Sequence, residues 1–404
     1  MDPLEWPRRR SGRGALESRP MDFGETHELG MVRESVRRIA AGFGYAYWAQ
    51  KARGGGKPDE LWRALGEAGF LGVNLPEAVG GGGLGIAATA IVCEELAAAG
   101  CPLLLMVVSP SICGSILARF GTEAQQREWL PDIAGGRRKM AFALTEPDAG
   151  SNTHNLSTTA TRDGAGWRLR GSKCYISFAD EADAVLVVAR TSTDERTGRA
   201  RLGLFIVPSD ARGLRRDLIP MEIIAPDRQF LLFFDDVALP EGALIGREGD
   251  GLRQVFHGLN PERITGAALA IGTGLYALAR ACEYARQRKV WGVPIGAHQG
   301  LAHPLARAKI DLELARLMTQ KAAWLYDTGQ EAGEAANIAK YAAAEAALGA
   351  VDQAIQTHGG HGLSQEFGLA ALWGGTRLAR IAPVSREMIL NFVAEHSLGL
   401  PRSY

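Results

Sequence analysis

The chain has 404 residues, which is enough for two or three domains around a sizeable hydrophobic core. Its 45 lysines and arginines balance its 45 aspartates and glutamates, so no basic surface for nucleic acid is expected. No uninterrupted apolar run reaches the roughly 18 residues that a membrane-spanning helix needs. The five cysteines form no CxxC pair, which favours reduced thiols in a cytoplasmic protein and predicts no metal site.

Residues 1–20 differ in composition from the rest of the chain. They are rich in arginine, proline and glycine, and they show no periodic apolar face. The acidic residues Asp2, Glu5 and Glu17 argue against a transit peptide. We therefore expect a disordered extension here, or an early start with Met21 as the natural first residue.

Residues 21–140 carry a helical pattern. Leu61, Leu65, Ala68 and Phe70 suit one helix with a buried face, and an alanine-rich apolar helix is expected over 86–99. The glycine cluster at 80–85 follows Leu-Pro instead of a strand that opens a βαβ unit, so it does not indicate a dinucleotide-binding loop. This part is predicted to be an all-α domain.

Residues 141–249 change to a strand pattern. The segment 167–170 alternates apolar and polar residues, 171–173 reads as a turn, and 174–177 resumes the strand. Short apolar runs follow at 184–189, 202–207 and 230–234. From 250 to 404 the pattern is helical again: Tyr341, Ala344, Leu348 and Val351 recur at three-four spacing, which is typical of a helical bundle.

Five short segments then occur in a specific order. They are TEPDAGSN at 145–152, KCYIS at 173–177, RQRKVWG at 286–292, GAHQ at 296–299 and QTHGGHG at 356–362. Together with the helix–β–helix order, this set resembles the acyl-CoA dehydrogenase family from about residue 21 to the end. The resemblance implies an α+β multidomain fold with an N-terminal all-α domain, a middle β-barrel or β-sandwich domain and a C-terminal four-helix bundle.

The resemblance also implies that FAD is the cofactor. It assigns flavin contacts in the β region to backbone and side-chain groups of Phe142, Thr145, Ser151, Tyr175 and Ser177. Donors there would stabilise the negative charge of a reduced flavin. From the residues alone, the hydroxyls of Thr145 and Ser151 could equally cap turns.

A second set of residues matches contacts to the remainder of FAD in a neighbouring subunit. Arg288 suits a pyrophosphate because its planar guanidinium fits two oxygens, although it could also be a solvated charge at a helix end. The resemblance therefore implies a homodimer or a homotetramer built from two dimers. The other members of this set are Trp291, Gln299, Gln356, Gly359, Gly360 and Thr376.

The reaction of this family needs a carboxylate that removes the α-proton of a thioester. Many members carry it in a Tyr-Glu-Gly-Thr stretch, which we match to Trp-Gly-Gly-Thr at 373–376, so that Gly374 takes the place of the acid. Other members carry the acid on the first long helix of the last domain, where this chain has Glu262. We expect Glu262 to be the base and the Gly374 amide to donate to the thioester carbonyl.

The stretch LNPERI at 259–264 admits a second interpretation of Glu262. Asn260 would be a good helix cap, Pro261 would suit the first helical position, and an acid there would complement the helix dipole. In the catalytic interpretation, Asn260 and Arg263 help to position the substrate.

The resemblance predicts α,β-dehydrogenation of an acyl-CoA in fatty acid metabolism, with an electron-transfer flavoprotein as acceptor. An oxidase or flavin monooxygenase on the same fold is the alternative, and a nucleic-acid-binding relative is disfavoured by the neutral charge. Neither membrane nor nucleic acid is expected as a partner. The sequence does not determine the length of the acyl chain. It also does not determine whether the thioester is carried by CoA or by an acyl carrier protein.

Overall fold

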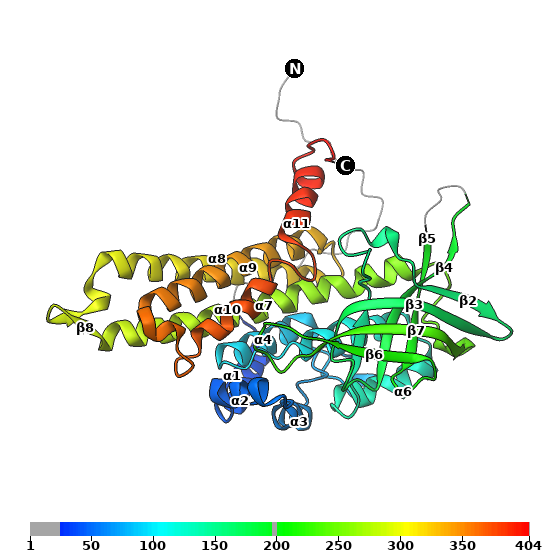
Figure 1. Ribbon diagram of the computed structural model, residues 1–404, viewed down its shortest axis with the longest axis horizontal. Helices are drawn as coiled ribbons and strands as arrows, with labels where there is room; N and C mark the ends of the chain where they lie inside the picture. Colours follow the sequence, from blue (N-terminus) through cyan, green and yellow to red (C-terminus); the bar gives the residue numbers. More distant parts are fainter. Residues whose placement is uncertain (1–24, 196–199, 404) are drawn as a thin grey trace, which may run out of the picture.

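The computed structural model describes residues 25–195 and 200–403, in which a helical layer, a sheet and a long helical bundle follow one another along the chain (Figure 1). This order confirms the predicted α+β fold with a β region between two helical regions. The disordered extension predicted over 1–20 lies outside the described residues.

The first region contains short helices that are amphipathic or wholly apolar. In α3, Leu61, Trp62 and Leu65 are buried on one face; the helix ends at Glu67, so the predicted Ala68 and Phe70 follow it. The bounds are α1 His27–Ala41, α2 Gly44–Gly54, α3 Asp59–Glu67, α4 Gly85–Ala98, the π-helix η2 Val107–Gly114, α5 Ser115–Phe120 and α6 Glu123–Ala134.

The second region forms one seven-stranded sheet in the order β1-β4-β2-β3-β7-β6, with β5 paired to β4. Its strands alternate more and less buried residues, as in β7, or are continuously buried, as in the first six residues of β4. The bounds are β1 Met140–Ala143, β2 Thr159–Asp163, β3 Gly166–Ser177, β4 Ala184–Thr193, β5 Ala200–Pro208, β6 Leu214–Ile219 and β7 Gln229–Pro240.

The predicted turn at 171–173 is wrong, because β3 runs through it without interruption. Instead, the pairing of β3 with β7 shifts register at two places, between Leu169 and Gly171 and between Lys173 and Ile176. Gly171 has φ 138°, and a Cβ atom there would lie 2.6 Å from the Cα of Thr158. Only glycine fits this bulge, so the glycine marks an irregular strand and not its end.

The third region is dominated by three long helices, with shorter ones beside them. Among the described residues, α7 is long and apolar enough to cross a membrane, but 67% of its most apolar window is buried inside the protein, as in a core helix. The bounds are α7 Gly251–Gln287, β8 Lys289–Val290, β9 Val293–Pro294, α8 Gln299–Asp327, α9 Gly333–His358, α10 Leu369–Leu378 and α11 Arg386–Phe392.

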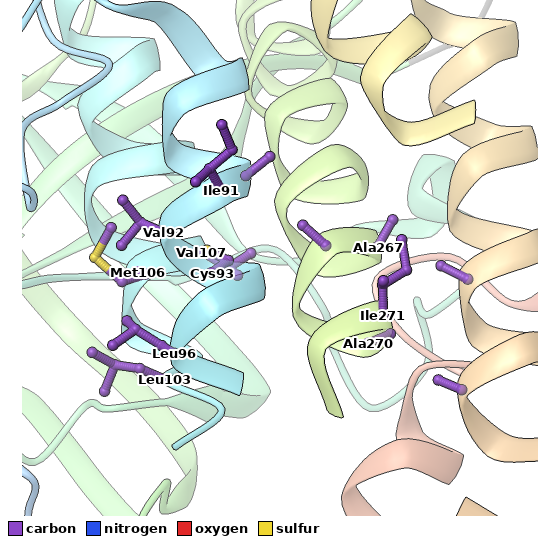
Figure 2. Packing of buried hydrophobic residues seen from close by; sticks show 14 of the residues in the cluster. Ile91, Val92, Cys93, Leu96, Leu103, Met106, Val107, Ala267, Ala270 and Ile271 are labelled. Carbon is purple, nitrogen blue, oxygen red and sulfur yellow. The ribbon is translucent and has the colours of Figure 1, made fainter. Parts of the chain in front are cut away.

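A continuous core joins the first region to the bundle. Helices α4 and α7 approach so closely that a Cβ at Gly272 would lie 2.2 Å from the carbonyl oxygen of Glu94. Side chains of α4, such as Ile91, and of α7, such as Ile271, belong to one buried cluster (Figure 2). This packing fixes α7 as a rigid axis, which is a suitable support for a functional side chain.

Candidate active site

Glu262 lies inside α7, about three turns after the helix begins. The alternative in which Asn260 caps this helix is wrong, because α7 starts at Gly251 and Asn260 is an interior residue. The Glu262 side chain is partly buried, and its Oε2 atom is buried without any hydrogen-bond partner. A buried acceptor without a partner is costly, so this carboxyl is a strong candidate for a functional group.

The electrostatic surroundings of Glu262 favour a base that works near neutral pH. Burial raises the pKa of Glu262 to about 7, while the positive charges of Arg263 and Lys340 oppose a further rise. Arg263 is itself buried, donates from Nη1 to Oδ1 of Asn260 at 3.0 Å, and leaves its Nε without a partner. Asn260 and Arg263 thus lie beside Glu262 on the same helix.

Lys340 is a neighbour that sequence reasoning did not find. It lies on α9, is 3% exposed, and its Nζ donates to the carbonyl oxygen of Val384 at 2.5 Å. Burial lowers the pKa of Lys340 to about 8, and the charge of Glu262 counteracts that effect. A signal existed in the sequence: a lysine stands at helical spacing between the buried alanines Ala336 and Ala343.

The role expected for Gly374 is wrong. Gly374 lies within α10, where helix geometry engages its amide with the carbonyl four residues earlier, so that amide cannot donate to a thioester. Thr376 is buried and donates its hydroxyl to the carbonyl of Leu372 at 2.8 Å, so it offers no free donor to a cofactor. The loop after α10 reaches the surroundings of Glu262 instead, through the bond between Lys340 and Val384.

The predicted flavin contacts of the β region gather at one end of β3 and the segment that follows β1. The Cys174 amide donates to the Thr145 carbonyl at 2.9 Å, which sets Tyr175 beside that segment. Tyr175 has φ 56° and is 61% exposed, and Ser177 exchanges hydrogen bonds with the Gln229 side chain. Phe142 lies on β1, and Ser151 is exposed in the segment that follows it.

A buried ion pair holds the segment after β1 in place. Lys173 and Glu146 are both buried, with their Nζ and Oε1 atoms 2.8 Å apart. Glu146 also accepts from the amides of Ser157 and Thr158. Burial alone would raise the pKa of Glu146, but Lys173 and the hydrogen bonds lower it to about 2. Sequence reasoning missed this pair, which holds the segment that carries the predicted flavin residue Thr145.

Apart from Thr376 on α10, the other predicted cofactor residues lie at the opposite end of the molecule. In Figure 1, β8 marks one end of the bundle and the sheet marks the other. Arg288 follows α7, and the helix rise places it about 39 Å from Glu262. Within one chain, Arg288 and the exposed residues near it are therefore not brought to Glu262. All its members outside α10 are exposed: Arg288, Trp291, Gln299, Gln356, Gly359 and Gly360.

Comparisons with known proteins agree with this architecture. Family models for the acyl-CoA dehydrogenase N-terminal, middle and C-terminal domains match residues 26–137, 141–236 and 249–398. The acyl-CoA dehydrogenase FadE12 of Mycobacterium tuberculosis is 58% identical over 384 residues, covering 95% of this chain and 99% of that protein.

Solved structures show the same fold. The glutaryl-coenzyme A dehydrogenase–glutaryl-CoA complex is 30% identical with a TM-score of 0.90, covering 95% of this chain and 98% of that one. PigA with FAD and proline is 28% identical with a TM-score of 0.88, covering 94% of this chain and 100% of that one. This protein is an enzyme of the acyl-CoA dehydrogenase family.

Proposed function

We propose that the protein oxidises an acyl-CoA thioester to the trans-2-enoyl-CoA, with FAD as cofactor and Glu262 as the base that removes the α-proton. The observation that carries the proposal is the buried, unpartnered Oε2 of Glu262 on a rigid helix. A base whose pKa is about 7 is substantially deprotonated near neutral pH, and it is also basic enough to favour taking up the α-proton.

The residues of the β region fit a flavin. Within the described part of the chain, the hydroxyls of Thr145 and Ser151 make no hydrogen bond, so they are free to donate. Tyr175 follows Cys174, whose amide bonds to Thr145, and presents an exposed ring in a backbone conformation that L side chains rarely adopt. When bound, the flavin would accept the hydride that leaves the β-carbon of the substrate.

The groups around Glu262 have separate tasks in this proposal. Arg263 and Lys340 supply positive charge that stabilises the carboxylate before proton transfer. The unpartnered Nε of Arg263, together with Asn260, is available to position the substrate. After transfer, Glu262 holds the proton in a partly buried site, from which it is exchanged once the product leaves.

We further propose a homodimer or homotetramer in which the exposed set around Arg288 holds part of the FAD of a neighbouring subunit. The separation of about 39 Å between Arg288 and Glu262 supports this arrangement, because one chain alone does not bring both sets together. An electron-transfer flavoprotein as acceptor, a role in fatty acid metabolism and a cytoplasmic location complete the proposal. The five cysteines, which are all free thiols, agree with a reducing compartment.

An anaerobic titration tests the proposal. Purified holoenzyme is mixed with a panel of acyl-CoAs, flavin absorbance is followed, and products are identified by mass spectrometry. Bleaching together with a product two hydrogen atoms lighter than the substrate supports dehydrogenation. No bleaching with any acyl-CoA would contradict the proposal. In a parallel aerobic assay, rapid oxygen consumption without an enoyl product would favour the oxidase or monooxygenase alternative.

A further inference from the structure

A stripe of partly exposed residues runs along α7 from Glu262. Between Pro261 and Gly274 every residue of this helix is buried except Glu262, Gly266 and Leu269. These three are separated by four and three positions, so they share one face. Residues such as Ala267 and Ile271, on the other side of the same segment, pack in the core (Figure 2).

Gly266 differs from the other glycines of α7. Cβ atoms built at Gly258, Gly272 and Gly274 would lie 2.6, 2.2 and 2.7 Å from neighbouring atoms, so close packing accounts for those glycines. A Cβ at Gly251 would likewise lie 2.4 Å from Leu202. At Gly266 no atom lies within 4 Å of the Cβ position. Packing inside the chain therefore does not account for Gly266. Glycine weakens a helix relative to alanine, so its presence here needs another reason.

Tyrosine side chains lie beyond the far end of the stripe. The rings of Tyr276, on α7, and Tyr45 lie 5.7 Å apart, and the Tyr45 hydroxyl donates to the Gly368 carbonyl at 2.9 Å. An apolar chain therefore fits in the direction of the tyrosines, and the polar CoA portion of a substrate would extend the other way from Glu262.

We infer that Gly266 determines acyl-chain specificity: its missing side chain leaves the width that an aliphatic chain occupies as it runs beyond the β-carbon towards Leu269. Gly266 lies about 6 Å along the helix from Glu262, so carbons well past the reacting pair would reach it. The inference rests on the proposed function. It assigns the substrate class as an aliphatic acyl-CoA whose chain extends several carbons beyond the β-carbon.

The test compares wild type with Gly266→Ala and Gly266→Val on butyryl-, hexanoyl-, octanoyl- and dodecanoyl-CoA. We expect Gly266→Val to lower kcat/KM for dodecanoyl-CoA by at least about tenfold and to leave butyryl-CoA within about threefold, with Gly266→Ala intermediate. Gly349→Val is the matched control, because Gly349 is an exposed helical glycine on α9 that also has no atom within 4 Å of its Cβ position.

Each outcome separates the inference from the function on which it rests. An unchanged chain-length profile in an active Gly266→Val enzyme would overturn the inference alone. Loss of bound FAD from that variant, with Gly349→Val retaining it, would also overturn it, because the space would belong to the cofactor. A wild-type enzyme that oxidises none of the four thioesters would instead contradict the proposed function.

Discussion

Replacing Glu262 by glutamine should make the protein more stable at alkaline pH. The folded protein raises the pKa of Glu262 from its ordinary value of 4.5 to about 7, mainly because burial disfavours the charged carboxylate. The contribution of this group to stability is therefore fully present below about pH 4.5 and is lost as pH rises through 7. Glutamine has nearly the same shape and carries no charge, so the variant does not lose this stability as pH rises.

The size of the effect follows from the same values. A rise from 4.5 to about 7 corresponds to roughly 3 kcal/mol of unfolding free energy, as an upper limit because the side chain keeps some solvent contact. For 404 residues, an unfolding entropy of about 2.1 cal/mol/K per residue converts this value into a rise in Tm of about 4 °C.

Thermal unfolding of the holoenzyme at pH 5, 6, 7 and 8 measures the effect. The difference in Tm between Glu262→Gln and wild type should grow from about a quarter of its full size at pH 5 to its full size at pH 8. Glu366→Gln, which changes an exposed glutamate, should show no such trend. A Glu262→Gln variant that is less stable than wild type at pH 8 would refute the idea that burial opposes the charge of this carboxylate.

Three further outcomes are expected. Lys340→Met removes a positive charge that lowers the pKa of Glu262, so the acidic limb of the pH profile of kcat/KM should move to higher pH; a profile that stays in place would exclude this coupling. Arg288→Ala should reduce the FAD bound per chain after dialysis while secondary structure by circular dichroism is retained, and full FAD retention would speak against the shared site. Glu146→Gln leaves buried Lys173 without its partner and should destabilise the protein by about 3–5 kcal/mol in urea unfolding; a difference below 1 kcal/mol would show that the pair is not structurally important.

The order of the three regions could be predicted from local patterns alone. Three-four spacing of apolar residues indicates the long helices, and short apolar runs indicate β4, β5 and β7. The start of α11 was also predictable, because Ser385 caps it by accepting from the amide of Met388 at 3.2 Å. These features depend on residues close together in the sequence, which is why periodicity and capping reveal them.

Errors arose where distant parts of the chain decide the local structure. Gly171 looks like a turn residue, but the close approach of Thr158 makes it a bulge within β3. Gly374 was matched by short-range similarity to the acid of a Tyr-Glu-Gly-Thr stretch, whereas it lies within α10 against Ile223 of the β region.

The candidate site was predictable only in part for the same reason. Glu262 could be proposed by resemblance to the family. The charge of Lys340 comes from α9, 78 residues further along the chain, and only packing of α9 against α7 makes the two neighbours. The open space at Gly266 exists because no other part of the chain packs there, and a local sequence pattern cannot reveal this.

Exchange of the substrate's α-proton with heavy water tests the central claim most directly. In a 3-thiaacyl-CoA the β-position is sulfur, so the ligand has no hydride to give and only proton removal is measured. With FAD bound, wild type should introduce deuterium at the α-carbon, and Glu262→Gln should do so about 10²–10⁴ times more slowly. If Glu262→Gln retains its FAD and exchanges the proton at the wild-type rate, Glu262 is not the base.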